Sequence, residues 1–417
     1  MFRKSILSNE LTVLTERMDG VRSVALGIWL RRGSRDESDG EGGLAHFIEH
    51  MVFKGTEKRS QAQIAQEMDA IGGQTDAFTT QEYAGFHVKV LDQHVPRGVD
   101  LLSDIVLSPR FDRDELERER RVIFEEIKTV EDNPEEFAHE LFAQAFWPDH
   151  PLGRPILGQP ETVARFDRDD LLRFFRRTYA PSNIIVAAAG NVDHEQLLSL
   201  VESRFARLET PPDGILATPP QPSMTVTLED KDLEQAHIVL GTVAPSQTSS
   251  DRFVSYVLNA ILGGSLSSRL FQVIREEHGL AYTVYSALSA FSDAGQFTVY
   301  AGSDPKKVPE VVDLVLHELR LIRDIPVQAE ELRRAKDHLC GSILMGLEST
   351  DARMSQLARQ ELYFGRHIAT EEAIQGIDSV TADDVLRLAS SIFQRPLAMT
   401  VVGRLGRLEW IPESLVA

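Results

Sequence analysis

Two histidines and a glutamate lie within five residues of one another, in the segment His46-Phe-Ile-Glu49-His50. On an α-helix, residues four apart lie one turn apart on the same face, so the imidazoles of His46 and His50 can point at one cation. Glu49 then lies beside that cation and can reach a water molecule bound to it. The spacing predicts a zinc site with its own general base, and the alternative is two surface histidines beside a solvated glutamate.

The residues around this motif favour a buried helix. Glycines at positions 40, 42 and 43 precede it, as expected of a loop that enters a helix. Phe47, Ile48 and Met51 make the helix too apolar to lie on a surface. Histidines in such a helix need partners inside the protein, and three protein ligands are typical of a catalytic zinc site. A third ligand is therefore expected elsewhere in the chain.

A second helix, predicted by periodicity over residues 113–130, offers two candidates for that ligand. Glu119 and Glu126 lie seven residues, or two turns, apart on its apolar side. A carboxylate buried without a partner is costly, so two of them on an inward face call for a cation or for donors. We expect one to bind the metal and the other to hold a ligand imidazole in place. The predicted apolar stripe consists of Val122, Ile123, Ile127 and Val130, with Arg121, Glu125 and Lys128 opposite.

The chain repeats itself weakly on either side of a proline-rich segment. Residues 210–222 contain five prolines and one glycine without periodicity, which is typical of an extended linker. Asp169, in Arg-Asp-Asp-Leu-Leu-Arg-Phe, corresponds to Asp383, in Ala-Asp-Asp-Val-Leu-Arg-Leu, 214 positions later. We therefore predict a tandem duplication, with a metal-bearing half over 1–209, a linker over 210–222 and a degenerate second half over 223–417.

The second half lacks the metal-binding residues. At about the same offset, His46 falls near Asn259, His50 near Gly263 and Glu126 near Ser342. We expect this half to serve as folding support or as a wall of the substrate site.

The order of predicted elements indicates the fold class. Each half begins with strands, such as those over residues 24–30 and 83–91, and continues with amphipathic helices and a late strand. Strands grouped apart from helices predict an α+β fold, in which each half-unit has an antiparallel sheet covered by helices on one face.

Composition limits the compartment. The 417 residues, 42% of them hydrophobic, suffice for two or three domains. The one cysteine, Cys340, excludes an intramolecular disulfide framework and fits a reducing compartment. The N-terminal residues include no apolar run of signal-peptide length, and no segment approaches the roughly 20 apolar residues that span a bilayer. We therefore expect a soluble, cytoplasmic protein with no membrane partner.

The net charge of −20 argues against a nucleic-acid partner. It leaves basic peptides as ligands that long-range attraction would favour, and the alternative is simply an acidic, soluble surface.

The motif His46-x-x-Glu49-His50, followed 76 positions later by Glu126, resembles the inverzincin metallopeptidases. This family includes pitrilysin, insulin-degrading enzyme and the β subunit of mitochondrial processing peptidase, and the chain is most similar to its short branch. The resemblance implies a zinc-dependent peptidase with one zinc ion per chain, bound by His46, His50 and Glu126. It also implies that Glu49 is the general base and that Glu119 supports a ligand.

Two further features of the family have counterparts here. Arg275 and Tyr282 match an Arg/Tyr pair that contacts substrate backbone carbonyls, and a guanidinium and a phenol both donate to such oxygens. The alternative is an ordinary surface arginine and a strand tyrosine. Residues 72–79 occupy the place of an exposed strand that pairs with the peptide. Asp76 stands where the family often has asparagine, so only the strand position is carried over.

The size of the chain bears on assembly. Long family members enclose peptide with four half-units in one polypeptide, whereas this chain has two. Because it carries both the metal motif and the Arg/Tyr pair, the resemblance implies a self-sufficient homodimer. The alternative function is a non-catalytic subunit that holds peptides or supports assembly. Such subunits typically have damaged metal motifs, whereas all five motif residues are intact here.

Overall fold

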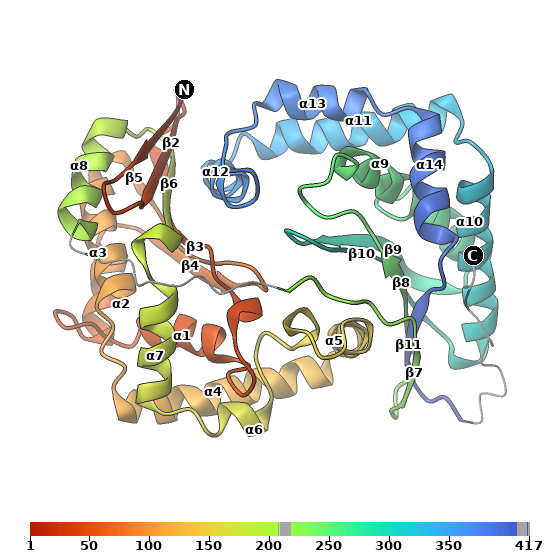
Figure 1. Cartoon of the computed structure of the whole chain (residues 1–417), viewed down its shortest axis with the longest axis horizontal. Coiled ribbons are helices and arrows are strands. Elements are labelled where there is room, and N and C mark those ends of the chain that lie inside the picture. Colours follow the sequence, from red (N-terminus) through yellow and green to blue (C-terminus); the bar gives the residue numbers. More distant parts are fainter. Residues whose placement is uncertain (207, 209–217, 407–414, 416–417) are drawn as a thin grey trace. The chain divides into compact units, whose positions relative to one another are not determined.

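The computed structural model describes residues 1–206, 208, 218–406 and 415. It divides into two compact units, each of which combines one β-sheet with α-helices (Figure 1). The first unit consists of Met1–Lys128, Arg154–Thr218 and Met345–His367, and the second of Thr129–Gly153, Pro219–Leu344 and Ile368–Ala417. The predicted α+β class is confirmed.

The first unit has a six-stranded sheet in the order β1-β2-β6-β3-β5-β4. Neighbouring strands are antiparallel except β2 and β6, which are parallel. Strand β4 lies at one edge, and its first three residues are exposed. The strands are β1 (Phe2–Ile6), β2 (Thr12–Arg17), β3 (Ser23–Leu30), β4 (Gln74–Thr79), β5 (Ala84–Leu91) and β6 (Ile184–Gly190).

The helices of the first unit pack mainly on one face of this sheet. Alternation along β3 directs Leu26 and Ile28 into the large core with these helices, and Ala25 and Trp29 to the opposite face. The helices are α1 (Leu44–Val52), α2 (Gln61–Ala70), α3 (Val95–Leu107), α4 (Arg113–Asp132), α6 (Pro160–Val163), α7 (Arg168–Thr178), α8 (His194–Phe205) and α12 (Thr350–Phe364).

The second unit repeats this arrangement with a five-stranded sheet in the order β7-β11-β8-β10-β9, in which only β7 and β11 are parallel. Its strands are β7 (Val226–Asp230), β8 (Ala236–Val243), β9 (Ala281–Ala290), β10 (Gly295–Ser303) and β11 (Ala398–Gly403). Its helices are α5 (Pro134–Phe146), α9 (Arg252–Leu262), α10 (Val308–Asp324), α11 (Ala329–Gly346), α13 (Thr370–Asp378) and α14 (Ala382–Phe393).

Each unit borrows one helix from the other half of the sequence. Helix α12, blue in Figure 1, packs on β2, β3 and β6, where Met354 accepts a 3.1 Å hydrogen bond from the Trp29 indole. Helix α5 packs on β8 and β11 of the second unit, where Phe142 and Phe146 join a small core with Tyr300. Each sheet therefore carries a helix on its second face as well.

Three expectations need qualification. Each sheet contains one parallel pair, so neither sheet is purely antiparallel. Helices α5 and α12 each belong to the unit formed mainly by the other half of the sequence, so the compact units do not follow the predicted halves 1–209 and 223–417. The division into these halves stays a prediction. Residues 210–217 of the predicted linker lie outside the described residues.

Among the helices that the structure describes, none combines the length and apolarity needed to cross a membrane.

The exchanged helix α5 lies so close to its sheet that Gly241 of β8 tolerates no side chain. A Cβ atom there would lie 2.5 Å from Phe142 Cζ and 2.9 Å from the Phe297 carbonyl oxygen. Gly241→Ala should therefore lower the free energy of unfolding by about 1–3 kcal/mol. Gly341→Ala in α11 is the control, because a Cβ there meets nothing within 4 Å and should be neutral or stabilising. Denaturant unfolding checks both, and equal stability of the two variants would contradict the close packing.

Candidate metal centre

Helix α1 carries three of the predicted site residues, His46, Glu49 and His50, and is fixed at its start. Gly43 precedes it with φ of 98°, and a Cβ there would lie 2.7 Å from the Leu157 carbonyl oxygen. Only glycine suits this position without strain. The buried Glu37 carboxylate accepts hydrogen bonds from the amides of Gly43 at 3.1 Å and Ala45 at 2.8 Å. Glu37 thus satisfies amides at the start of α1.

The apolar residues of α1 hold its orientation. Phe47, Ile48, Met51 and Val52 are all completely buried in the core of the first unit. Because a close-packed core permits little rotation of a helix about its axis, the direction in which the two imidazoles point is set by the opposite side of α1.

Helix α4 supplies the two carboxylates. Glu119 is buried and Glu126 is partly exposed, at 39% of its side chain. The predicted stripe was wrong in one residue: Val122 is 43% exposed. The buried side follows spacings of three and four through Leu116, Glu119, Arg120, Ile123 and Ile127. Val122 lies beside this narrow stripe and faces solvent.

The two helices bring three possible ligand atoms together. Glu126 Oε2 lies 3.6 Å from His46 Nε2 and 3.4 Å from His50 Nε2, and all three atoms lie within 4.8 Å of one another. Tetrahedral ligands about 2.0–2.1 Å from a zinc ion are roughly 3.3–3.4 Å apart, so the spacing fits one ion. Glu126 Oε2 is buried and accepts no hydrogen bond. A divalent cation would satisfy this oxygen.

The electrostatic state of His46 suits a metal ligand. Burial, and secondarily the charge of His50, lowers the pKa of His46 to about 3. The imidazole is therefore neutral near pH 7, which leaves a nitrogen lone pair for coordination.

A chain of hydrogen bonds extends behind His50. Its Nδ1 atom lies 3.1 Å from Glu119 Oε2, and Glu119 Oε1 lies 2.7 Å from the Lys54 ammonium. With Glu119 as acceptor, the proton resides on Nδ1 and Nε2 presents its lone pair toward Glu126. The sequence prediction missed Lys54, which lies in the turn just after the end of α1.

Glu49, on the same helix, lies beside the possible ligands. Burial raises the pKa of its carboxyl, and a 2.5 Å hydrogen bond from the Thr79 hydroxyl opposes this rise. Burial, and secondarily the charge of Glu49, raises the pKa of Tyr179 at the end of α7. Thr79 was not predicted as a site residue.

Arg275 and Tyr282 belong to the second unit and lie next to each other there. The Arg275 guanidinium lies 4.7 Å from the Phe271 ring centre and 4.8 Å from the Tyr282 ring centre. Tyr282 is 76% exposed. Arg275 lies in the π-helical segment Phe271–Glu277. This conformation is rare in proteins, and where it occurs it is often at a functional site. The partly exposed guanidinium thus lies over both rings, and its Nε atom lies 3.5 Å from Glu276 Oε1.

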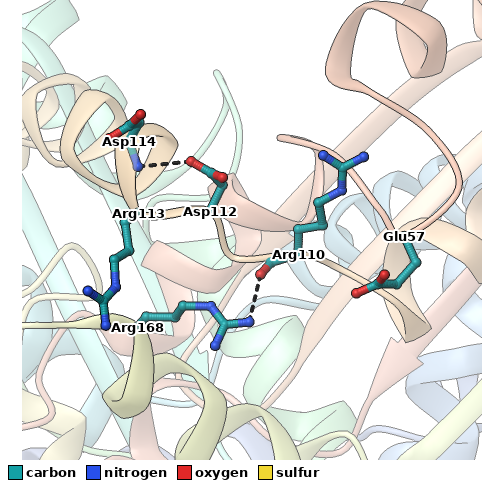
Figure 2. Close-up of a pocket in the computed structure, with 6 residues that line it drawn as sticks. All are labelled: Glu57, Arg110, Asp112, Arg113, Asp114 and Arg168. Carbon is teal, nitrogen blue, oxygen red and sulfur yellow. Dashed lines mark hydrogen bonds between the residues drawn. The ribbon is translucent and has the colours of Figure 1, made fainter.

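An open depression of about 520 Å³ lies at the start of α4, away from the predicted residues (Figure 2). Arg168 donates to the carbonyl oxygens of Phe111 and Arg110, and Arg110 donates to that of Thr56. These bonds fix the start of α4 against α7 and the loop after α1. The depression is lined by three cationic and three acidic side chains: Glu57, Arg110, Asp112, Arg113, Asp114 and Arg168.

Comparison with known proteins identifies relatives over the whole chain. The family model "Insulinase (Peptidase family M16)" matches residues 12–160, and "Peptidase M16 inactive domain" matches residues 165–339. An uncharacterized zinc protease of Mycobacterium leprae is 39% identical, over 99% of this chain and 94% of the relative. One of Bacillus subtilis is 35% identical, over 98% of this chain and all of the relative.

Solved structures share the fold. A protease from Helicobacter pylori superposes with a TM-score of 0.90 at 21% identity, over 96% of this chain and 99% of that one. A peptidase M16 inactive domain from Pseudomonas fluorescens gives a TM-score of 0.90 at 19% identity, over 96% and 98% of the two chains.

The hydrogen-bond chain makes a testable claim about Lys54. Replacing Lys54 by methionine removes the ammonium that holds Glu119, so His50 should be less well oriented and Zn²⁺ affinity should fall about 10- to 100-fold. Competition with a chromophoric chelator measures this affinity. Lys58→Met is the matched control, because Lys58 is 63% exposed and lies 3.9 Å from Asp104 instead. Equal affinities for the two variants would contradict the role of Lys54.

Proposed function

Because the chain belongs to the insulinase family of peptidases, M16, we propose that it is a zinc-dependent endopeptidase or oligopeptidase that hydrolyses extended peptides or precursor segments. One zinc ion per chain is held by His46, His50 and Glu126. The observation that supports this most is the spacing of 3.4 and 3.6 Å between Glu126 Oε2 and the two imidazole nitrogens. The names of the relatives as zinc proteases agree with the donor set.

The side chains around the ion have distinct tasks. A bound zinc ion supplies Lewis acidity, which lowers the pKa of a water ligand toward about 7 and polarises a carbonyl group. Glu49 takes the proton from the attacking water and delivers it to the leaving amine. Burial raises the pKa of Glu49, which brings this carboxylate closer to the working range of a general base and acid. Glu119 keeps the His50 proton on Nδ1.

Peptide binding is proposed for two surfaces. Strand β4 is an edge strand with three exposed residues, and pairing of its backbone with an extended peptide would give affinity with little demand on sequence. Arg275 and Tyr282 donate hydrogen bonds to peptide carbonyl oxygens, including one that develops negative charge. Asp76 keeps no assigned role.

The alternative, a non-catalytic peptide-holding or assembly subunit, differs in its requirement for the metal motif. The match to an inactive domain covers residues 165–339, which do not include the proposed ligands. The intact His46, Glu49, His50 and Glu126 favour the peptidase.

Substitution of the base tests the proposal. Glu49→Gln should retain zinc and lose about 10²- to 10⁴-fold in turnover, because the amide cannot accept the proton. The measurement is cleavage of a mixed peptide library, followed by mass spectrometry, with and without chelator and with elemental analysis. Glu125→Gln is the matched control, since Glu125 lies next to a proposed ligand but is 73% exposed. Cleavage by Glu49→Gln at the parental rate, or parental cleavage that resists chelation, would contradict the proposal.

We also propose a homodimer. Long members of the family enclose a peptide with four half-units, whereas this chain has two, so two chains would supply the same number. This chain also carries both the metal motif and the Arg/Tyr pair. Sedimentation at several concentrations should show a dimer that is active without another subunit. A monomer with full activity would contradict this assembly.

A further inference from the structure

We infer that Thr79 is a positioning residue for Glu49. Strand β4, which we propose to pair with the peptide, would thereby also orient the general base. This inference rests on the proposed function. It starts from the 2.5 Å hydrogen bond that the Thr79 hydroxyl donates to Glu49 Oε2. In the described part of the chain, Thr79 is the only hydrogen-bond donor to the Glu49 carboxylate.

The sheet geometry directs Thr79 toward α1. Side chains alternate along a strand, so Ala77 and Thr79 of β4 share one face and Phe78 takes the other. Ala77 packs on the core that contains α1, whereas Phe78 packs on Trp29 with a ring separation of 5.1 Å. Helix α1 packs against β4 directly. The alternation of side chains along β4 therefore directs Thr79 toward Glu49 on α1. In the register of β4 with β5, Thr79 lies opposite Ala84.

A threonine suits this task for two reasons. Its β-branched side chain has few rotamers, so the backbone of β4 sets the direction of the hydroxyl. Glu49, in contrast, has a flexible side chain whose carboxylate needs an external partner to keep one orientation. The hydroxyl is neutral, so it holds Oε2 without cancelling the negative charge that makes Glu49 a base. The second oxygen, Oε1, remains for proton transfer.

The position of Thr79 links substrate binding to catalysis. Thr79 is the last residue of β4, the edge strand that we propose to pair with peptide. A peptide that adds to this edge would order the same backbone that carries the hydroxyl. Because the peptide would pair with the backbone of β4 whereas the Thr79 side chain contacts Glu49, loss of the hydroxyl should slow the chemical step and leave peptide affinity nearly unchanged.

Two substitutions at Thr79 test this in the intact zinc-loaded protein. Thr79→Val keeps the shape of the side chain and removes the donor, so kcat should fall about 10- to 100-fold while KM changes by less than about twofold. Thr79→Ser restores a donor and should recover most of kcat. Zinc content should equal that of the parent in both variants. Thr227→Val is the matched control, because Thr227 lies on β7, an edge strand of the other sheet.

A binding measurement separates orientation of the base from damage to the strand. In the Glu49→Gln background, adding Thr79→Val should leave the dissociation constant of an uncleaved peptide unchanged within about twofold. Weaker binding there, loss of zinc, a serine variant as slow as the valine variant, or parental kcat in Thr79→Val would each overturn the role of Thr79. A parent protein without chelator-sensitive cleavage would instead overturn the proposed function, and this role with it.

Discussion

The structure depends on holding three electron-rich atoms next to one another: His46 Nε2, His50 Nε2 and Glu126 Oε2. None of them satisfies another, because the two Nε2 atoms lie 3.6 and 3.4 Å from Glu126 Oε2 and this buried oxygen accepts no hydrogen bond. Bringing such atoms out of water costs free energy unless a cation joins them. The surrounding fold must therefore keep them in place, as the hydrogen bonds between Glu37 and the start of α1 and between Glu119 and His50 illustrate.

The two helices that carry these atoms are fixed in different ways. Helix α1 is surrounded by apolar side chains and begins on the buried Glu37 carboxylate. Helix α4 buries a narrower apolar stripe, which includes Leu116, Ile123 and Ile127, and hydrogen bonds from Arg120 add to this packing. The buried Arg120 donates to the Val163 carbonyl and, at 2.7 Å, to that of Phe166, and it also lies 5.8 Å from the centre of the Phe47 ring in α1. Arg120 thus ties the carboxylate helix to the histidine helix.

How much of the site could be predicted from the sequence depended on how far apart the interacting residues lie along the chain. The spacing of His46, Glu49 and His50 within one helix, and the apolar side shared by Glu119 and Glu126, are local patterns that sequence reveals directly. That α1 meets α4 could be inferred only from the need for a third ligand and from family resemblance. Thr79 and the helix exchange depend on strand register and tertiary packing, which no periodicity encodes. Val122 shows that a stripe drawn from apolar residues alone can be one residue too wide.

The second unit repeats the helix and strand arrangement, and its described residues include no group of three possible metal ligands. Asn259 of α9, near which His46 falls at the offset of the predicted duplication, accepts a 2.8 Å hydrogen bond from Ser286 of β9, and Ser286 is itself buried. This hydrogen bond joins helix α9 to strand β9. Since β9 also carries the exposed Tyr282, this internal bond supports the strand that displays it. Among the described residues of the second unit, the region near the predicted counterpart of His46 is thus held by a hydrogen bond between a helix and a strand, without a group of possible metal ligands.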